Sequence, residues 1–199
     1  MNARAAVGPL LVAAVLLAAG CGDSDDEPEP EPRPLETAEK LPKLPSGWRE
    51  HTNRAGGFAL GVPRGWKATD RKISTLVRSF DRLVAVSITP DRTSEALELP
   101  LEDFATRALL ALDGFRGDID PSDPRPFKHR YDGVRVRARA TEADSGVEQD
   151  LELIVLRRPR LATFTVVIAA NAERDSAPSR RVAQRVVDTL RGRPVAAAR

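Results

Sequence analysis

The sequence predicts an α+β sandwich, in which a mainly antiparallel sheet of about six strands is flanked by two principal helices. Several segments alternate between apolar and polar residues, which is typical of strands with one buried face. Two of them, residues 134–142 and 147–156, are joined by the turn sequence Asp144-Ser145-Gly146. Residues 100–113 and 177–191 instead carry apolar side chains at three- and four-residue steps, which indicates amphipathic helices.

Residues 1–20 resemble an export signal. Arg4 is followed by an apolar run at residues 10–20, which is shorter than the roughly 20 residues of a membrane span. Ala18-Ala19-Gly20-Cys21 is similar to the processing box of bacterial lipoproteins, although Ala18 stands where Leu is commoner. The resemblance implies that the leader is removed and that Cys21 carries lipid, such as palmitate, on the extracytoplasmic face of the bacterial cell membrane. A plain secretory leader and an uncleaved anchor are the alternatives.

Residues 21–45 are predicted to be a disordered tether. They are rich in Pro and in acidic residues and contain few apolar ones, so they cannot bury enough surface to fold. At about 3.1 Å per residue, a Pro-rich segment of this length reaches roughly 75 Å from the lipid. Cys21 is the only cysteine, which excludes an internal disulfide and a thiolate zinc cluster.

The folded domain is predicted to span residues 46–194, followed by a frayed tail at residues 195–199. Residues 22–45 carry eight acidic and three basic side chains, whereas residues 46–199 have a net charge of +6. A basic domain would suit anionic lipid or wall polymers as partners, but the excess of Arg and Ala is explained equally well by a high-GC coding bias of the gene. Aromatic residues are only 5% of the chain and no Arg-aromatic motif occurs, which argues against nucleic acid as a partner.

A corner motif opens the domain. The segment Gly57-Phe58-Ala59-Leu60-Gly61-Val62-Pro63 is typical of a strand that Pro63 ends, and Gly65 permits a turn that returns Trp66 to the core. Gly57, Phe58, Pro63, Gly65 and Trp66 together resemble the opening of the PsbP-like fold. That fold includes a photosystem extrinsic protein, a Ran-binding import factor and actinobacterial lipoproteins of the LpqN kind. The resemblance extends in outline over residues 47–194 and implies a non-enzymatic binding or assembly protein, with no functional residues to carry over.

The remaining elements follow in order. Strands are expected at residues 72–80 and 83–89, the second ended by Pro90; a helix from Pro100 to Gly114; strands at residues 127–131, 134–142, 147–156 and 161–170; and a helix over residues 177–191, capped by Ser176 and ended by Gly192 and Pro194. In the hairpin, Arg139 is expected to face Asp150, and Arg137 to face Glu152. The arginine row is therefore predicted to be a solvated, paired face. The strand at residues 161–170 is expected to be covered on both faces.

The chain lacks the usual signatures of catalysis and of cofactor or metal binding. His51 and His129 are the only histidines, and no Gly-x-Ser-x-Gly, phosphate-loop or dinucleotide motif occurs. The acidic loop Gly114–Pro126 fails the calcium-loop template, because the sixth and twelfth positions counted from Asp118 are Asp123 and His129. We therefore expect no cofactor and no metal. Five aromatic residues are predicted to lie in the core: Trp48, Phe58, Trp66, Phe104 and Phe164.

Two functions from different classes remain open. The first is a monomeric, membrane-anchored, non-enzymatic module that binds an envelope protein or a small apolar ligand, with the Gly114–Pro126 loop as the first candidate surface. The second is an envelope hydrolase or transferase with an unrecognised carboxylate pair. A cleft with one carboxylate of raised pKa would favour the enzyme, and an exposed apolar patch would favour binding. A spacer without a specific ligand is a third reading.

Overall fold

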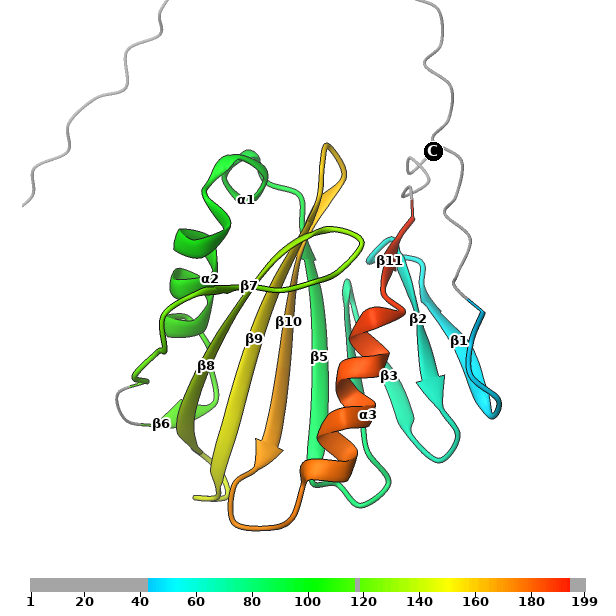
Figure 1. Ribbon diagram of the computed structural model, residues 1–199, viewed down its shortest axis with the longest axis vertical. Helices are drawn as coiled ribbons and strands as arrows, with labels where there is room; N and C mark the ends of the chain where they lie inside the picture. Colours follow the sequence, from blue (N-terminus) through cyan, green and yellow to red (C-terminus); the bar gives the residue numbers. More distant parts are fainter. Residues whose placement is uncertain (1–42, 117–118, 194–199) are drawn as a thin grey trace, which may run out of the picture. The chain divides into compact units, whose positions relative to one another are not determined.

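The computed structural model describes residues 43–116 and 119–193. These residues form an α+β structure with two antiparallel sheets (Figure 1). The larger sheet has eight strands, with the order β3-β4-β5-β10-β9-β8-β6 and β7 paired to β8; the smaller sheet has the order β1-β2-β11. The predicted fold class is confirmed. The predicted single sheet was too small, because several short strands carry no clear alternation.

The smaller sheet is built around β2 (Phe58–Pro63), which lies between β1 (Trp48–Asn53) and β11 (Arg191–Gly192). All six residues of β2 are buried, whereas the alternating pattern predicted one buried face. Leu44 covers the second face at Gly61, where it packs so closely that an added Cβ would lie only 2.7 Å from its side chain. The Gly61 N–H also donates a hydrogen bond of 2.7 Å to the hydroxyl of Thr189.

The larger sheet starts with β3 (Lys67–Arg71), β4 (Ser74–Arg78) and β5 (Val84–Asp91). The sequence reading did not predict β3, which pairs with β4 so that Lys67 lies opposite Arg78. The predicted end of the next strand, before Pro90, is also wrong, because β5 continues to Asp91. Pro90 is tolerated there because the pairing of β4 with β5 extends only as far as Ile88, so no ladder bond to β4 needs its missing N–H.

Two helices follow β5. The first, α1 (Ser94–Glu98), was not predicted; the hydroxyl of Thr93 caps it by accepting a hydrogen bond of 3.2 Å from the Ala96 N–H. The second, α2 (Leu101–Leu110), lies where the sequence predicted a helix, directly after Pro100. Two short strands, β6 (Phe115–Arg116) and β7 (Arg125–Pro126), then pair with β8.

The predicted strand at residues 127–131 is wrong. The Phe127 N–H donates a hydrogen bond of 2.8 Å to the Gly133 carbonyl, which closes a turn across these residues. The rings of Phe127 and His129 stack with centroids 6.5 Å apart, and those of His129 and Tyr131 lie 5.1 Å apart. The alternating aromatic residues therefore pack on one another within a loop.

The predicted hairpin is confirmed as β8 (Asp132–Glu142) and β9 (Glu148–Arg158), in the expected register. The next strand, β10 (Ala162–Asn171), lies between β9 and β5. One of its faces is buried and the other is mostly half-buried, so only part of the predicted two-sided cover is present.

The last helix, α3 (Ala177–Asp188), is shorter than predicted. Arg191 and Gly192 do not end a helix but form β11 against Ala59 and Phe58 of β2. The hydroxyl of Ser176 does not cap the helix and donates instead to the Asn171 carbonyl at 3.1 Å. The predicted frayed tail, residues 195–199, lies outside the described residues.

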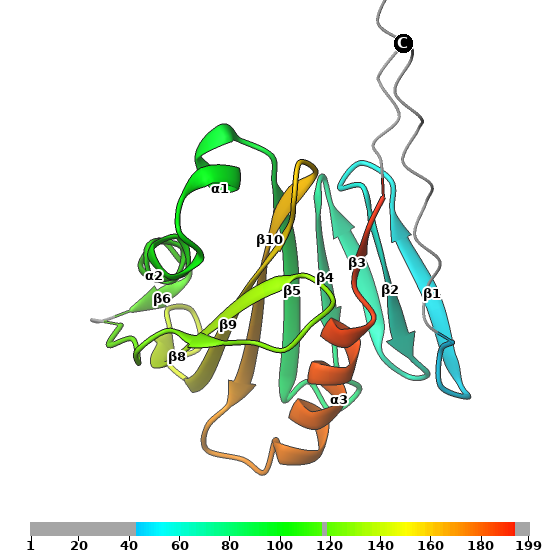
Figure 2. The same cartoon turned by 45° about the horizontal axis from the view of Figure 1, so that its top comes forward.

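The larger sheet separates two apolar clusters. On one face, α2 packs over β8 and β9 against a cluster that includes Val136 and Leu153. On the other face, α3 contacts β2, β5 and β10, and the larger cluster includes the edge-to-face rings of Phe58 and Phe164, 6.1 Å apart. Figure 2 shows α2 and α3 beside different parts of the sheet.

Candidate functional site

A hollow crosses the α2 face of the larger sheet, and we call it the Phe80 trough. It has a volume of about 650 Å³ and receives residues from every strand between β3 and β6 in the sheet order. Ala85 and Ala169, which lie opposite each other on β5 and β10, belong to its lining. The other lining residues are Gly65, Lys67, Arg78, Ser79, Phe80, Arg82, Leu83, Val84, Phe115, Glu142 and Gln149.

Phe80 stands out among these residues because its side chain is 86% exposed. It lies in the turn between β4 and β5, directly before Asp81. A phenylalanine ring in water forgoes about 1.5–3 kcal/mol that its burial would provide. Because it lines a hollow and is the most exposed of the large hydrophobic side chains among the described residues, Phe80 is the first candidate for a contact surface or an apolar ligand site.

Hydrogen bonds to Asp81 fix the turn that carries Phe80. Oδ1 of Asp81 accepts from the hydroxyl of Ser79 at 2.5 Å and from the Leu83 N–H at 3.0 Å, and Oδ2 accepts from the hydroxyl of Ser179 at 2.8 Å. Burial alone would raise the pKa of Asp81, but these bonds together lower it below its ordinary value. Asp81 is therefore charged at neutral pH, and the turn is held to α3.

One end of the trough is basic. Lys67 and Arg78 lie directly opposite each other on β3 and β4, an arrangement that is unfavourable for like charges. Arg82, in the same turn as Phe80, has a positive φ of 59°. None of these three cations forms an ion pair with another described residue.

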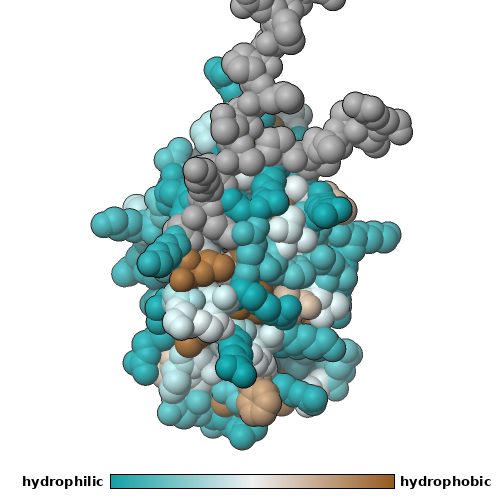
Figure 3. Space-filling view, turned by 90° about the vertical axis from the view of Figure 1, so that its right-hand side faces the viewer, coloured by the Kyte–Doolittle hydropathy of each residue, from teal (hydrophilic) through white to brown (hydrophobic). Residues whose placement is uncertain are grey.

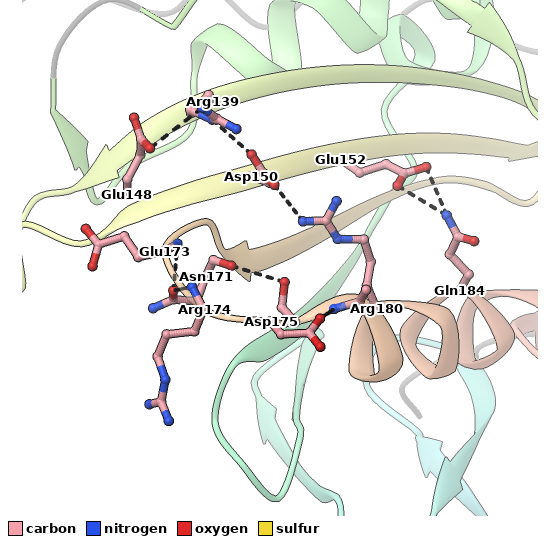
Figure 4. Close-up of polar contacts among 12 residues, drawn as sticks. Arg139, Glu148, Asp150, Glu152, Asn171, Glu173, Arg174, Asp175, Arg180 and Gln184 are labelled. Carbon is pink, nitrogen blue, oxygen red and sulfur yellow. Dashed lines mark hydrogen bonds and ion pairs between the residues drawn. The ribbon is translucent and has the colours of Figure 1, made fainter.

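The opposite face of β8 and β9 carries a charged cluster, shown in Figure 4. Asp150 accepts from Arg139 at 3.0 Å and from Arg180 of α3 at 2.7 Å. Glu152 contacts Arg135 at 3.3 Å and Gln184 of α3 at 3.3 Å. The predicted opposition of Arg137 to Glu152 holds in the register, but Arg135 is the arginine in contact with Glu152.

The charged cluster differs from the predicted solvated row because α3 reaches over it, and Glu152 is only 6% exposed. Burial alone would raise the pKa of Asp150, but hydrogen bonds from Arg180 and Arg139 lower it. A carboxylate held in its charged form by two arginines is a poor general acid. The cluster thus has the chemistry of a structural ion-pair network.

The two histidines take part in separate contacts. His51 Nε2 lies 2.8 Å from Oδ1 of Asp70, which also accepts from the hydroxyl of Thr75 at 2.7 Å. His129 lies within the aromatic stack. Within residues 43–116 and 119–193, no group of three or more His, Cys, Asp or Glu side chains is arranged to hold a metal ion.

The corner residues occupy the start and end of β2. Gly57 and Gly65 have positive φ values of 64° and 85°, a conformation that favours glycine. The Trp66 N–H donates to the Pro63 carbonyl at 3.1 Å, which turns the chain toward β3.

Of the aromatic residues predicted to be core, Phe58 and Phe164 are fully buried, whereas Trp48, Trp66 and Phe104 are half-buried against the two clusters. Trp48 also lies under the Arg185 guanidinium, 5.8 Å from the ring centroid.

Other sites named from the sequence are placed only in part. Cys21 and most of the acidic segment lie outside the described residues, as does Asp118. The loop Gly114–Pro126 contributes Phe115 to the trough, although the sequence offered no reason to connect it with Phe80. Among the described residues, no helix has the length and apolar character needed to span a bilayer. The face in Figure 3 is mainly hydrophilic, with small, separate hydrophobic areas.

No protein-family model matches the sequence, and no curated protein sequence matches it. Solved structures do resemble it. PsbP (CyanoP) from Synechocystis sp. PCC 6803 aligns with a TM-score of 0.52 at 12% identity, over 78% of this chain and 98% of its own. The Ran-binding protein Mog1p of Saccharomyces cerevisiae aligns with a TM-score of 0.51 at 10% identity, over 73% and 95%. The chain therefore has a PsbP-like fold, as predicted.

LpqN, which is involved in cell envelope biogenesis of Mycobacterium tuberculosis, is 19% identical over 80% of this chain and 87% of its own. Its TM-score is 0.38, so this alignment carries no argument about function. At such identities the neighbours establish the fold alone, and the function has to be argued from this chain's own surfaces.

Proposed function

We propose that the protein is a lipoprotein of the bacterial cell envelope and acts there as a non-enzymatic binding module, with an apolar group of its ligand or partner bound in the Phe80 trough. The observation that carries the proposal is the exposed ring of Phe80, on a turn that Asp81 holds in place. A binding group on a turn whose backbone is already fixed loses less conformational entropy when its partner binds. Aromatic anchors of this kind supply much of the binding energy at protein interfaces.

The envelope location rests on the sequence of residues 1–21, whose processing box ends at Cys21. A lipid on Cys21 would hold the domain near the membrane, and the acidic tether would set its reach. The PsbP-like fold is compatible with a binding role, because Mog1p, with the same fold, is a Ran-binding protein.

The enzymatic alternative has less support. The carboxylates that come closest to a catalytic pair are Asp150 and Glu152. Asp150 contacts Arg139 and Arg180, and Glu152 contacts Arg135. Burial raises the pKa of Asp188, although Arg185 opposes the shift. Asp188 lines neither the trough nor the charged cluster, so it has no carboxylate partner in either place.

Site-specific crosslinking in the native envelope tests the trough. The full-length protein would carry a photoreactive phenylalanine at position 80 or, as a control, at Leu110, which is 60% exposed on α2. We expect a defined crosslinked product from position 80 and none of that product from position 110. Equal products from both positions, or none from position 80, would contradict a binding role for the trough.

Metabolic labelling with a palmitate analogue tests the anchor separately. We expect label on the wild-type chain and on the chain with Phe80→Ala, but not on the chain with Cys21→Ala. We also expect the Cys21→Ala protein to lose the position-80 product if the partner is reached only at the membrane. Label that survives Cys21→Ala would exclude acylation at this cysteine.

A further inference from the structure

We propose that the Phe80 trough binds one molecule of a single-chain amphiphile with an anionic head, a carboxylate or a phosphate, taken up as a monomer and not as part of a bilayer surface. This inference rests on the proposed binding function and names its ligand class. Three features of the trough carry it: its proportions, its basic end and the polarity of its two ends.

The proportions fit one extended chain. The lining runs across seven neighbouring strands, from β3 to β6 in the sheet order. With about 4.8 Å between neighbouring strands, this contour is about 29 Å long. A volume of about 650 Å³ spread along it leaves a narrow cross-section. Small side chains at Ala85 and Ala169 let a chain lie close to the middle of the sheet.

The head would bind at the β3-β4 end. Lys67 and Arg78 are adjacent across the ladder and have no acidic partner among the described residues, so an anion between them would relieve their repulsion. Arg82, two residues after Phe80 in the same turn, supplies a third positive charge to the lining. A guanidinium suits the two oxygens of a carboxylate or phosphate because it presents two parallel N–H donors.

The opposite end would hold the tail. Phe115 of β6 supplies an aromatic surface there, next to Glu142 of β8, with which it is paired. The Glu142 carboxylate accepts a hydrogen bond of 2.6 Å from the hydroxyl of Ser145. A negative charge at this end disfavours an anionic head, so the two ends together fix the direction in which the ligand binds.

Titration with three twelve-carbon probes tests the ligand class: dodecanoate and dodecyltrimethylammonium, each below its micelle concentration, and dodecanol, below its solubility limit. The protein would be the full chain with Cys21→Ser, so that no attached lipid competes and any binding outside the trough is common to all variants. We expect dodecanoate to bind more tightly than dodecanol, and dodecyltrimethylammonium to bind most weakly. Binding of dodecanol as tight as that of dodecanoate would overturn the proposed anionic head.

Three variants locate the binding site. Phe80→Ala should weaken dodecanoate binding at least about tenfold, since the ring loses its apolar contact. Replacing Lys67 and Arg78 together by Gln should weaken it about two- to fivefold for each exposed charge, and should leave dodecanol binding unchanged. The matched control replaces Lys128 and Arg130 by Gln, an exposed Lys and Arg outside the trough. An equal loss in the control and in the Lys67/Arg78 variant would overturn the assignment.

The outcomes separate this inference from the function on which it rests. Binding to vesicles of anionic lipid with no binding of monomeric dodecanoate would overturn the inference and indicate a membrane surface. If no amphiphile binds but the position-80 crosslink to a protein persists, the ligand class is wrong and the proposed function stands. Absence of both would remove the proposed function as well.

Discussion

The carboxylate of Asp81 accepts a hydrogen bond of 2.8 Å from the hydroxyl of Ser179, which lies 98 residues later in the chain. This bond joins the β4-β5 turn to the first turn of α3. The apolar residues of α3 pack against the larger core cluster, so the position of the turn depends on how the core is packed. The turn that carries the exposed ring of Phe80 is thereby held by the folded core and not only by its own hydrogen bonds.

Asp81→Ala should destabilise the protein and loosen the trough. The substitution removes the acceptor of three hydrogen bonds, each worth about 0.5–1.5 kcal/mol in a typical case. Because Asp81 is exposed and water can replace it, we expect a total loss of about 1–2 kcal/mol in the free energy of unfolding, measured with urea. Asp113→Ala, at an exposed aspartate after α2, is the control and should change little. A loss no greater than that of the control would show that the bonds to Asp81 do not hold the turn.

The stability of the domain should decrease in acid because Asp81 and Asp150 have lowered pKa values. For both, burial acts in the opposite direction but is outweighed, at Asp81 by hydroxyl and backbone donors and at Asp150 by two arginines. A carboxyl with a lower pKa in the folded state stabilises that state above its unfolded pKa of about 3.9. This contribution is lost as the pH falls through the lower folded pKa. Asp150→Asn should therefore flatten the decrease in unfolding free energy between about pH 5 and pH 2. A variant whose acid profile runs parallel to that of the wild type would contradict the role of this ion-pair network.

The sequence predicted the parts of the fold that depend on local pattern. The hairpin of β8 and β9, its register and the position of α2 all follow from alternation, turn residues and helical spacing. The pattern failed where tertiary contacts decide. Residues 127–131 alternate in apolar character but pack as an aromatic stack in a loop. The helical pattern predicts Arg191 as the end of the last helix and Gly192 as its stop, yet both residues pair with β2.

The trough could not have been predicted from the sequence alone, because its residues come from seven strands whose order in the sheet is not their order in the chain. One local signal was available. Phe80 precedes Asp81-Arg82, a polar pair between two strands, and an aromatic residue beside a tight turn has few ways to reach the core. The strand predicted for residues 72–80 includes Phe80, whereas β4 ends at Arg78 and leaves Phe80 in the turn.

Asn53→Ala should be the most destabilising of these changes, because Asn53 joins the two sheets. Its side chain is 1% exposed and lies at the end of β1. The amide donates to the Ser74 carbonyl at 3.0 Å and to the Thr75 hydroxyl at 3.1 Å, and Oδ1 accepts from the Gly56 N–H at 2.7 Å. Alanine would remove the acceptor of the buried Gly56 N–H and the donor to the Ser74 carbonyl and the Thr75 hydroxyl, at about 1–3 kcal/mol for a buried group left unsatisfied.

We therefore expect Asn53→Ala to lower the free energy of unfolding by about 2–4 kcal/mol, measured with urea at neutral pH. Asn171→Ala is the matched control, because the side chain of Asn171 likewise bonds the backbone, accepting from the N–H groups of Glu173 and Arg174, but at exposed positions where water can replace it. The control should lose less than half as much. Equal losses would mean that burial of the Asn53 amide adds nothing to what its hydrogen bonds contribute.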